Sequence, residues 1–228
     1  MTTTVVKEDA SVVLCDIEGT TTSIKFVKDV LFPYVRENLE SYLERTWETA
    51  QTKGDVQALR DQWTADKAAG VEGAVPIPDG HTREVRDACV KSVRWQMDND
   101  RKATALKQLQ GHIWKDAYES GAVKGHVYDD VRPAMERWVA DGIQVQVYSS
   151  GSVAAQKLLF KHSENGDMTK LLSGHYDTRI GGKMEAASYR RIAEEAMTKP
   201  NSILFLSDRI EGVGRARGSQ SLECIALC

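Results

Sequence analysis

The sequence has few cysteines, no long apolar run and no excess of one charge. Its 228 residues contain four cysteines, and no pair of them shows the C-x-x-C spacing or the nearby histidine that a zinc site requires. No segment approaches the ~20 consecutive apolar residues of a membrane-spanning helix. Residues 1–11 also lack the apolar stretch of a signal peptide. We therefore expect a protein of the reduced cytoplasm, without disulfides and without membrane contact.

Charges of the two signs are nearly balanced. Thirty basic and 33 acidic side chains give a formal net charge of -3. Nucleic-acid-binding domains usually carry a basic surplus, so no nucleic-acid partner is expected. Hydrophobic residues make up 41% and charged residues 28% of the chain, which is typical of a globular fold of one large or two modest domains. This balance is compatible with one small phosphorylated substrate, because such a ligand needs only a local positive site.

Apolar segments predict the strands of a sheet: Val12–Cys15, Ile143–Tyr148, Tyr176–Ile180, Ile203–Leu206 and Leu222–Leu227. The first and fourth are continuous and rich in aliphatic residues, which is typical of parallel strands buried on both faces. In the second, Gln144 and Gln146 alternate with apolar residues, which predicts one less buried face.

Helical periodicity dominates residues 24–126, where no strand is predicted. Apolar residues recur at three- and four-residue steps from Val27 to Leu43, with Pro33 expected to kink or divide the segment. Further helices are expected at Arg83–Met97, Ala103–Tyr118, Asp130–Ala140, Ser152–His162 and Ser188–Met197. The pattern predicts an α/β fold, with a Rossmann-like parallel-sheet core of residues 1–23 and 127–228 and a helical insertion of residues 24–126.

Polar residues follow three predicted strands where each ends: Asp16 and Glu18, Ser149 and Ser150, and Asp208. In open α/β sheets, ligands bind at the carboxyl ends of the strands, so we expect these residues to share one site. Lys183, which follows the Gly181–Gly182 pair, is expected to join them.

Each residue type has a role in phosphoryl transfer. A carboxylate such as Asp16 can attack phosphorus and form an acyl phosphate, and Glu18 could protonate the leaving oxygen and then activate water. Mg²⁺ prefers oxygen ligands of the kind that Asp16 and Asp208 supply. A serine hydroxyl and the Lys183 ammonium would hold the phosphoryl oxygens. Taken singly, these residues are more typical of turns, helix caps and solvated lysines, so the hypothesis rests on their order and shared position.

That order resembles the motif order of the haloacid dehalogenase (HAD) superfamily: apolar strand with D-x-[DE]-G-T, strand with Ser, Lys, and strand with [ST]-Asp. More specifically, the chain is similar to the enolase-phosphatase (acireductone synthase) family over most of residues 11–208, with Glu18 where HAD proteins usually have Asp. The matching segments are Asp16–Ile24, Phe26–Tyr34, Gly73–Pro78, Lys107–Trp114 and Tyr148–Ser152.

The resemblance implies a bifunctional enzyme of methionine salvage. It would enolise 2,3-diketo-5-methylthiopentyl-1-phosphate and dephosphorylate it, through an aspartyl-phosphate, to the acireductone 1,2-dihydroxy-3-keto-5-methylthiopentene. The family pattern implies a monomer of the cytoplasm, and in animals also of the nucleus, whose helical insertion caps the core. The implied roles are Mg²⁺ binding by Asp16, Glu18 and Asp208, nucleophilic attack by Asp16, and substrate binding by Ser149, Ser150 and Lys183.

The chain departs from the family after Asp208. Residues 209–220 contain three glycines, which disfavour a helix, and lack the family's Arg-Pro-Gly segment; Glu211 is the candidate for the acid found beyond the metal aspartate. Two alternatives therefore stay open: a HAD phosphatase for another small phosphate ester, and an isoform whose altered C-terminus impairs catalysis. His112 and His175 are candidates for the enolisation base, although a polar packing role is the more typical one for each.

Overall fold

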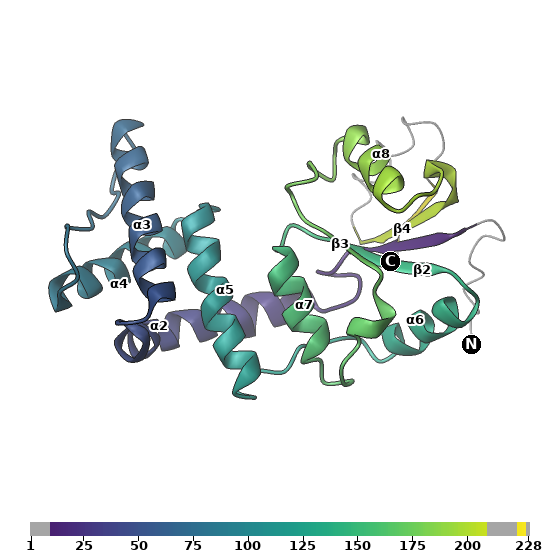
Figure 1. Ribbon diagram of the computed structural model, residues 1–228, viewed down its shortest axis with the longest axis horizontal. Helices are drawn as coiled ribbons and strands as arrows, with labels where there is room; N and C mark the ends of the chain where they lie inside the picture. The colour runs from purple at the N-terminus through teal and green to yellow at the C-terminus, as the bar shows by residue number, and fades with distance from the viewer. Residues whose placement is uncertain (1–9, 209–222, 227–228) are drawn as a thin grey trace. The chain divides into compact units, whose positions relative to one another are not determined.

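The protein divides into two compact units (Figure 1). In a computed structural model that describes residues 10–208 and 223–226, the sheet unit comprises residues 1–27 and 118–228, and the helical unit comprises residues 28–117. The insertion predicted from the sequence was residues 24–126. Residues 1–9, 209–222 and 227–228 lie outside the described residues, and the expectations for residues 209–220, for Glu211 and for Cys228 fall there.

The sheet unit is built on five parallel strands in the order β3-β2-β1-β4-β5, which confirms the predicted α/β fold. The strands are β1 Val12–Cys15, β2 Gln144–Tyr148, β3 Gly174–Tyr176, β4 Ile203–Ser207 and β5 Glu223–Ala226. Every residue of β1 is buried, because this central strand has neighbours on both edges and helices on both faces. Cys15 pairs with Val147 on one side and Leu206 on the other, so the carboxyl ends of three strands meet at one edge.

Helices cover the two faces of this sheet (Figure 1). The element α8 lies over one face, and α6 and α7 lie over the other. The helices of the unit are α1 Ile24–Phe26, α6 Val131–Ala140, α7 Val153–Lys161 and α8 Ala186–Glu195, with 3₁₀ turns η2 Thr169–Leu171 and η3 Pro200–Ser202. Tyr189 and Ile192 of α8 pack against Leu14, Tyr148 and Phe205 of the strands. This apolar contact fixes α8 on the sheet.

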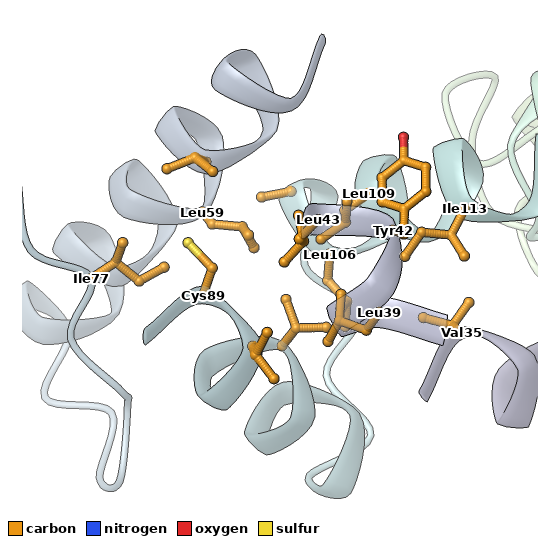
Figure 2. Packing of buried hydrophobic residues seen from close by; sticks show 14 of the residues in the cluster. Val35, Leu39, Tyr42, Leu43, Leu59, Ile77, Cys89, Leu106, Leu109 and Ile113 are labelled. Atoms are coloured by element: carbon orange, nitrogen blue, oxygen red, sulfur yellow. The ribbon is translucent and has the colours of Figure 1, made fainter. Parts of the chain in front are cut away.

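The helical unit buries a core of its own (Figure 2). Its elements are the π-helical turn η1 Val27–Leu31 and the helices α2 Phe32–Thr46, α3 Ala50–Ala68, α4 Arg83–Asp98 and α5 Thr104–Glu119. Side chains from all four helices point toward one another, including Leu39, Leu43, Leu59, Cys89 and Leu109. Pro33 lies in the first turn of α2, directly after the π-helical turn η1, so the helical segment changes from one type to the other beside this proline. None of the described helices is both long and apolar enough to cross a bilayer.

Helix α3 was not predicted from the sequence. Thr49 caps this helix by accepting a hydrogen bond from the Thr52 amide. Its buried face mixes Val56 and Leu59 with Thr52, Asp55 and Asp66, so the apolar period is weak. Polar partners supplied by other helices make that face stable, and a local pattern cannot reveal them.

Two predictions about the strands were wrong. Strand β3 ends at Tyr176 and does not continue to Ile180, because the Asp177 carboxylate accepts hydrogen bonds from the Arg179 and Val153 amides and turns the chain. Gln146 was expected on a less buried face, yet it is 3% exposed. Its amide nitrogen donates to Gln144 Oε1, so the amide is partly satisfied inside the sheet unit.

Candidate active site

The site begins with a tight turn at the end of β1. The Asp16 amide donates to Leu206 O at 2.8 Å, which keeps this residue in register with β4. The next carbonyl, that of Ile17, accepts bonds from the amides of Thr20, Thr21 and Thr22. Gly19 has a φ of +80°, a conformation that glycine adopts readily and other residues rarely do. The motif D-x-E-G-T therefore folds back on itself directly after the nucleophile candidate.

Asp16 is buried and held at both carboxylate oxygens. The Lys183 ammonium forms an ion pair with Oδ1, which also accepts a bond from the Ile17 amide at 2.7 Å. The Ser207 hydroxyl donates to Oδ2 at 3.2 Å. The side chains of Asp16 and Lys183 are only 5% and 24% exposed, so their attraction is screened less than that of a surface pair. The structure thus brings the predicted nucleophile and the predicted lysine together.

Asp208 lies against the same turn. Its amide donates to Thr20 Oγ1 at 3.1 Å, and a Cβ on Gly19 would collide with its carboxylate. Its Oδ1 is buried and makes no hydrogen bond to the described part of the chain. Burying a carboxylate oxygen without a partner is costly, and a bound cation would relieve that cost. The residues therefore fit a metal ion at Asp208.

The side chains around Asp208 do not supply a complete set of metal ligands. Within the described residues, no three acidic, histidine or cysteine side chains converge closely enough to hold a metal ion. Glu18, the third predicted ligand, is exposed two residues beyond Asp16. Mg²⁺ commonly binds one or two carboxylates and completes its coordination shell with water and substrate phosphate. An incomplete set of protein ligands is therefore compatible with this ion.

The predicted phosphate-binding serines follow β2. Ser149 is 4% exposed, and its hydroxyl accepts a bond from the Gly151 amide at 3.2 Å. Ser150 is exposed beside it. Because β2 pairs directly with β1, both serines lie at the sheet edge that carries Asp16.

Two side chains that the sequence analysis did not single out fasten this serine loop. The Gln156 amide nitrogen donates to Gly151 O at 2.9 Å and to Tyr176 O at 2.8 Å. Asp177 Oδ2 accepts from the Val153 amide at 3.2 Å. Burial opposes a charge on Asp177, but the bonds from Arg179 and Val153 outweigh it and keep the pKa of this carboxyl below its usual value. No sequence signal marked Gln156, since a glutamine on a helix is usually solvated.

His112 has a structural partner, whereas burial keeps the side chains of His175 and Cys15 uncharged. In the helical unit, His112 Nδ1 lies 2.7 Å from Oδ2 of Asp55, a fully buried carboxylate that also accepts a bond from Gln108. Burial, aided by the positive charge of Lys157, lowers the pKa of His175 to about 4, so this ring is neutral at physiological pH. Burial, and secondarily Asp16, raises the pKa of Cys15 to about 12, so its thiol stays protonated beside the site.

Known proteins resemble this chain in sequence and in fold. A family model described as haloacid dehalogenase-like hydrolase matches residues 10–218. Enolase-phosphatase E1 of Anopheles gambiae is 54% identical over 87% of this chain and 68% of its own length. Enolase-phosphatase E1 of Xenopus tropicalis is 52% identical over 88% of this chain and 78% of its own length. The structure of the UTR4 protein of Saccharomyces cerevisiae superposes with a TM-score of 0.75 at 29% identity, covering 95% of this chain and 89% of that one.

Proposed function

Because the chain belongs to the haloacid dehalogenase-like hydrolases, and within them to the enolase-phosphatase family, we propose that it is an enolase-phosphatase of methionine salvage. Its substrate would be 2,3-diketo-5-methylthiopentyl-1-phosphate. The products would be the acireductone 1,2-dihydroxy-3-keto-5-methylthiopentene and inorganic phosphate. The observation that carries the chemistry is the buried contact of Lys183 with Asp16 at the end of the central strand.

Asp16 is the proposed nucleophile. One of its carboxylate oxygens attacks phosphorus, the bond between phosphorus and the ester oxygen breaks, and an aspartyl-phosphate forms. Water then attacks the phosphorus of this acyl phosphate, which releases phosphate and restores the carboxylate. Lys183 reduces the repulsion between the two anions and, with Ser149 and Ser150, holds the phosphoryl oxygens.

Magnesium is the proposed cofactor, with Asp16, Glu18 and Asp208 as the residues that would hold it. When bound, the ion would neutralise negative charge on the phosphoryl group. The partnerless Oδ1 of Asp208 supports this assignment. Glu18 is proposed chiefly as a metal-site residue; its exposure also leaves it accessible for proton transfer to the leaving oxygen.

The helical unit is proposed as the cap of the family, the part that excludes water and selects the carbon skeleton. The sheet unit is the proposed catalytic core. The enolisation base is not assigned, because His112 is engaged with Asp55 and His175 lies within β3, one residue before its carboxyl end. The cytoplasmic and nuclear location and the monomeric state stay predictions from the family.

The proposal is tested by supplying the diketo phosphate ester to the purified protein with Mg²⁺ in the absence of oxygen. We expect acireductone absorbance to appear together with inorganic phosphate, in equal amounts. Phosphate release without the enol product would favour a phosphatase for another small ester. Absence of both products, with no effect of Mg²⁺ on thermal stability, would favour a catalytically impaired protein.

A further inference from the structure

Four side chains donate hydrogen bonds to consecutive carbonyl oxygens of the segment that carries Lys183. Arg191 donates to Ile180 O at 2.8 Å, and Ser188 donates to Gly182 O at 2.9 Å. The hydroxyls of two buried tyrosines bind the other two: Tyr148 donates to Gly181 O and Tyr189 donates to Lys183 O, each at 2.8 Å. The segment 180–183 lies outside the helices and strands, so these side-chain bonds add to a few backbone turn bonds, such as that from the Ile180 amide to Asp177 O, in holding its course.

Tyr148 makes a second contact with the same lysine. The Lys183 ammonium lies over its ring, 5.8 Å from the ring centroid, within the range of a cation–π interaction. The Tyr148 side chain is fully buried, and its ring packs edge-on against Tyr189 with centroids 5.8 Å apart. Burial raises the pKa of Tyr148, although a hydrogen bond with Ser188 opposes the shift, so the hydroxyl stays protonated and able to donate.

The turn before Lys183 requires a glycine at position 181. Gly181 has a φ of +126°, and a Cβ at this position would collide with Ser188 Oγ. A lysine has a long flexible stem, so its ammonium stays at one place only when its backbone is fixed and its head group has a preferred surface. The carbonyl contacts provide the first condition, and the Tyr148 ring provides the second.

We propose that Tyr148 and Tyr189 are positioning residues that hold the Lys183 ammonium at the Asp16 carboxylate. They act through Lys183 and are not themselves expected to touch the substrate. The inference rests on the proposed role of Lys183 in binding the phosphoryl group. It adds that the residue before Ser149 and a residue of α8 determine how well that lysine performs this role.

A double-mutant cycle with inorganic phosphate as the probe separates positioning from general stability. The variants are Tyr148→Phe, Lys183→Met and the double substitution, each tested as the full chain with Mg²⁺ by calorimetric titration. Tyr148→Phe keeps the ring and its packing but removes the bond to Gly181 O. We expect it to weaken phosphate binding roughly two- to tenfold, which is the range that one neutral hydrogen bond supplies. In the Lys183→Met background, the same substitution should change binding by less than about twofold.

Tyr189→Phe is the second variant, and it should show the same dependence on Lys183 because its hydroxyl holds the lysine's own carbonyl. Tyr118→Phe is the matched control: its buried hydroxyl has no hydrogen-bond partner among the described residues, so phosphate binding should be unchanged. The proposal is overturned if Tyr148→Phe lowers the melting temperature without affecting phosphate binding. Equal effects in both backgrounds, or wild-type binding by Lys183→Met, would overturn it as well. If the diketo phosphate ester is not converted but phosphate binding behaves as expected, the result would instead count against the proposed function.

Discussion

The Lys183 ammonium contacts Oδ1 of Asp16 at the carboxyl end of β1, although the two residues come from distant parts of the sequence. The pair is mostly shielded from solvent. The lysine therefore compensates the charge of the proposed nucleophile before any phosphate arrives, and an anionic substrate meets less repulsion.

Asp16→Asn should remove phosphatase activity while leaving the fold intact. The amide keeps the side-chain volume, and its oxygen can still accept a bond from the Ile17 amide or the Ser207 hydroxyl. A carboxamide is a poor nucleophile, so phosphate release should fall by at least about a thousandfold. Phosphate release and thermal unfolding are the measurements. Ser207→Ala is the comparison variant, because it removes a hydrogen bond to Asp16 but leaves the carboxylate in place, and it should retain much of the activity. Comparable activity in Asp16→Asn and the parent would rule out Asp16 as nucleophile.

Gly19→Ala should damage the site more than its backbone strain alone explains. Gly142 is the matched control, since its φ of +79° is nearly that of Gly19, but a Cβ there meets no atom within 4 Å. Both substitutions should lose about 1–2 kcal/mol of unfolding free energy from left-handed strain. Only Gly19→Ala should also displace Asp208 and weaken Mg²⁺ binding. Denaturant unfolding and Mg²⁺ titration test this, and equal Mg²⁺ affinity in both variants would contradict it.

Added Mg²⁺ should raise the melting temperature, and removing it with a chelator should reverse the rise. A ligand that binds only the folded state stabilises it by about 2.7 kcal/mol at a hundred times its dissociation constant. Asp208→Asn should lose most of this shift, because the substitution removes the negative charge of the carboxylate that carries the partnerless Oδ1. Differential scanning calorimetry of both proteins provides the measurement. An undiminished shift in the variant would place the ion elsewhere.

Stability should decline in mild acid partly because of His175. Its pKa is about 4 in the folded protein against 6.5 for an unperturbed histidine side chain, so the unfolded chain takes up a proton first as the pH falls. The loss of unfolding free energy should begin near pH 6.5 and be complete near pH 4. It should reach about 1–2 kcal/mol, because solvent screens part of the effect. Urea unfolding at about pH 7 and about pH 5 measures it. His175→Asn should show a smaller decline than the parent, and an identical decline would exclude this histidine as a source.

Local patterns in the sequence were sufficient for the central strands of the sheet, and they placed several candidate site residues at strand ends. Continuous apolar runs identified β1 and β4, because a parallel strand covered on both faces needs apolar residues at successive positions. The same runs located Asp16 and Asp208 at strand ends. Periodicity failed for α3, where buried Asp55 relies on Gln108 and His112 from another helix. The end of β3 was also missed, because the side chain of Asp177 determines it.

The amino-acid sequence alone determined that the site residues follow strand ends and a glycine turn, because strand ends and glycine turns depend on short-range preferences. Only the tertiary structure decided which atoms meet: Lys183 with Asp16, Ser207 with the other carboxylate oxygen, and Tyr148 with the loop beneath the lysine. The physical reason is that such contacts depend on the register of neighbouring strands and on side-chain directions after packing. Neither quantity is encoded within any single stretch of residues.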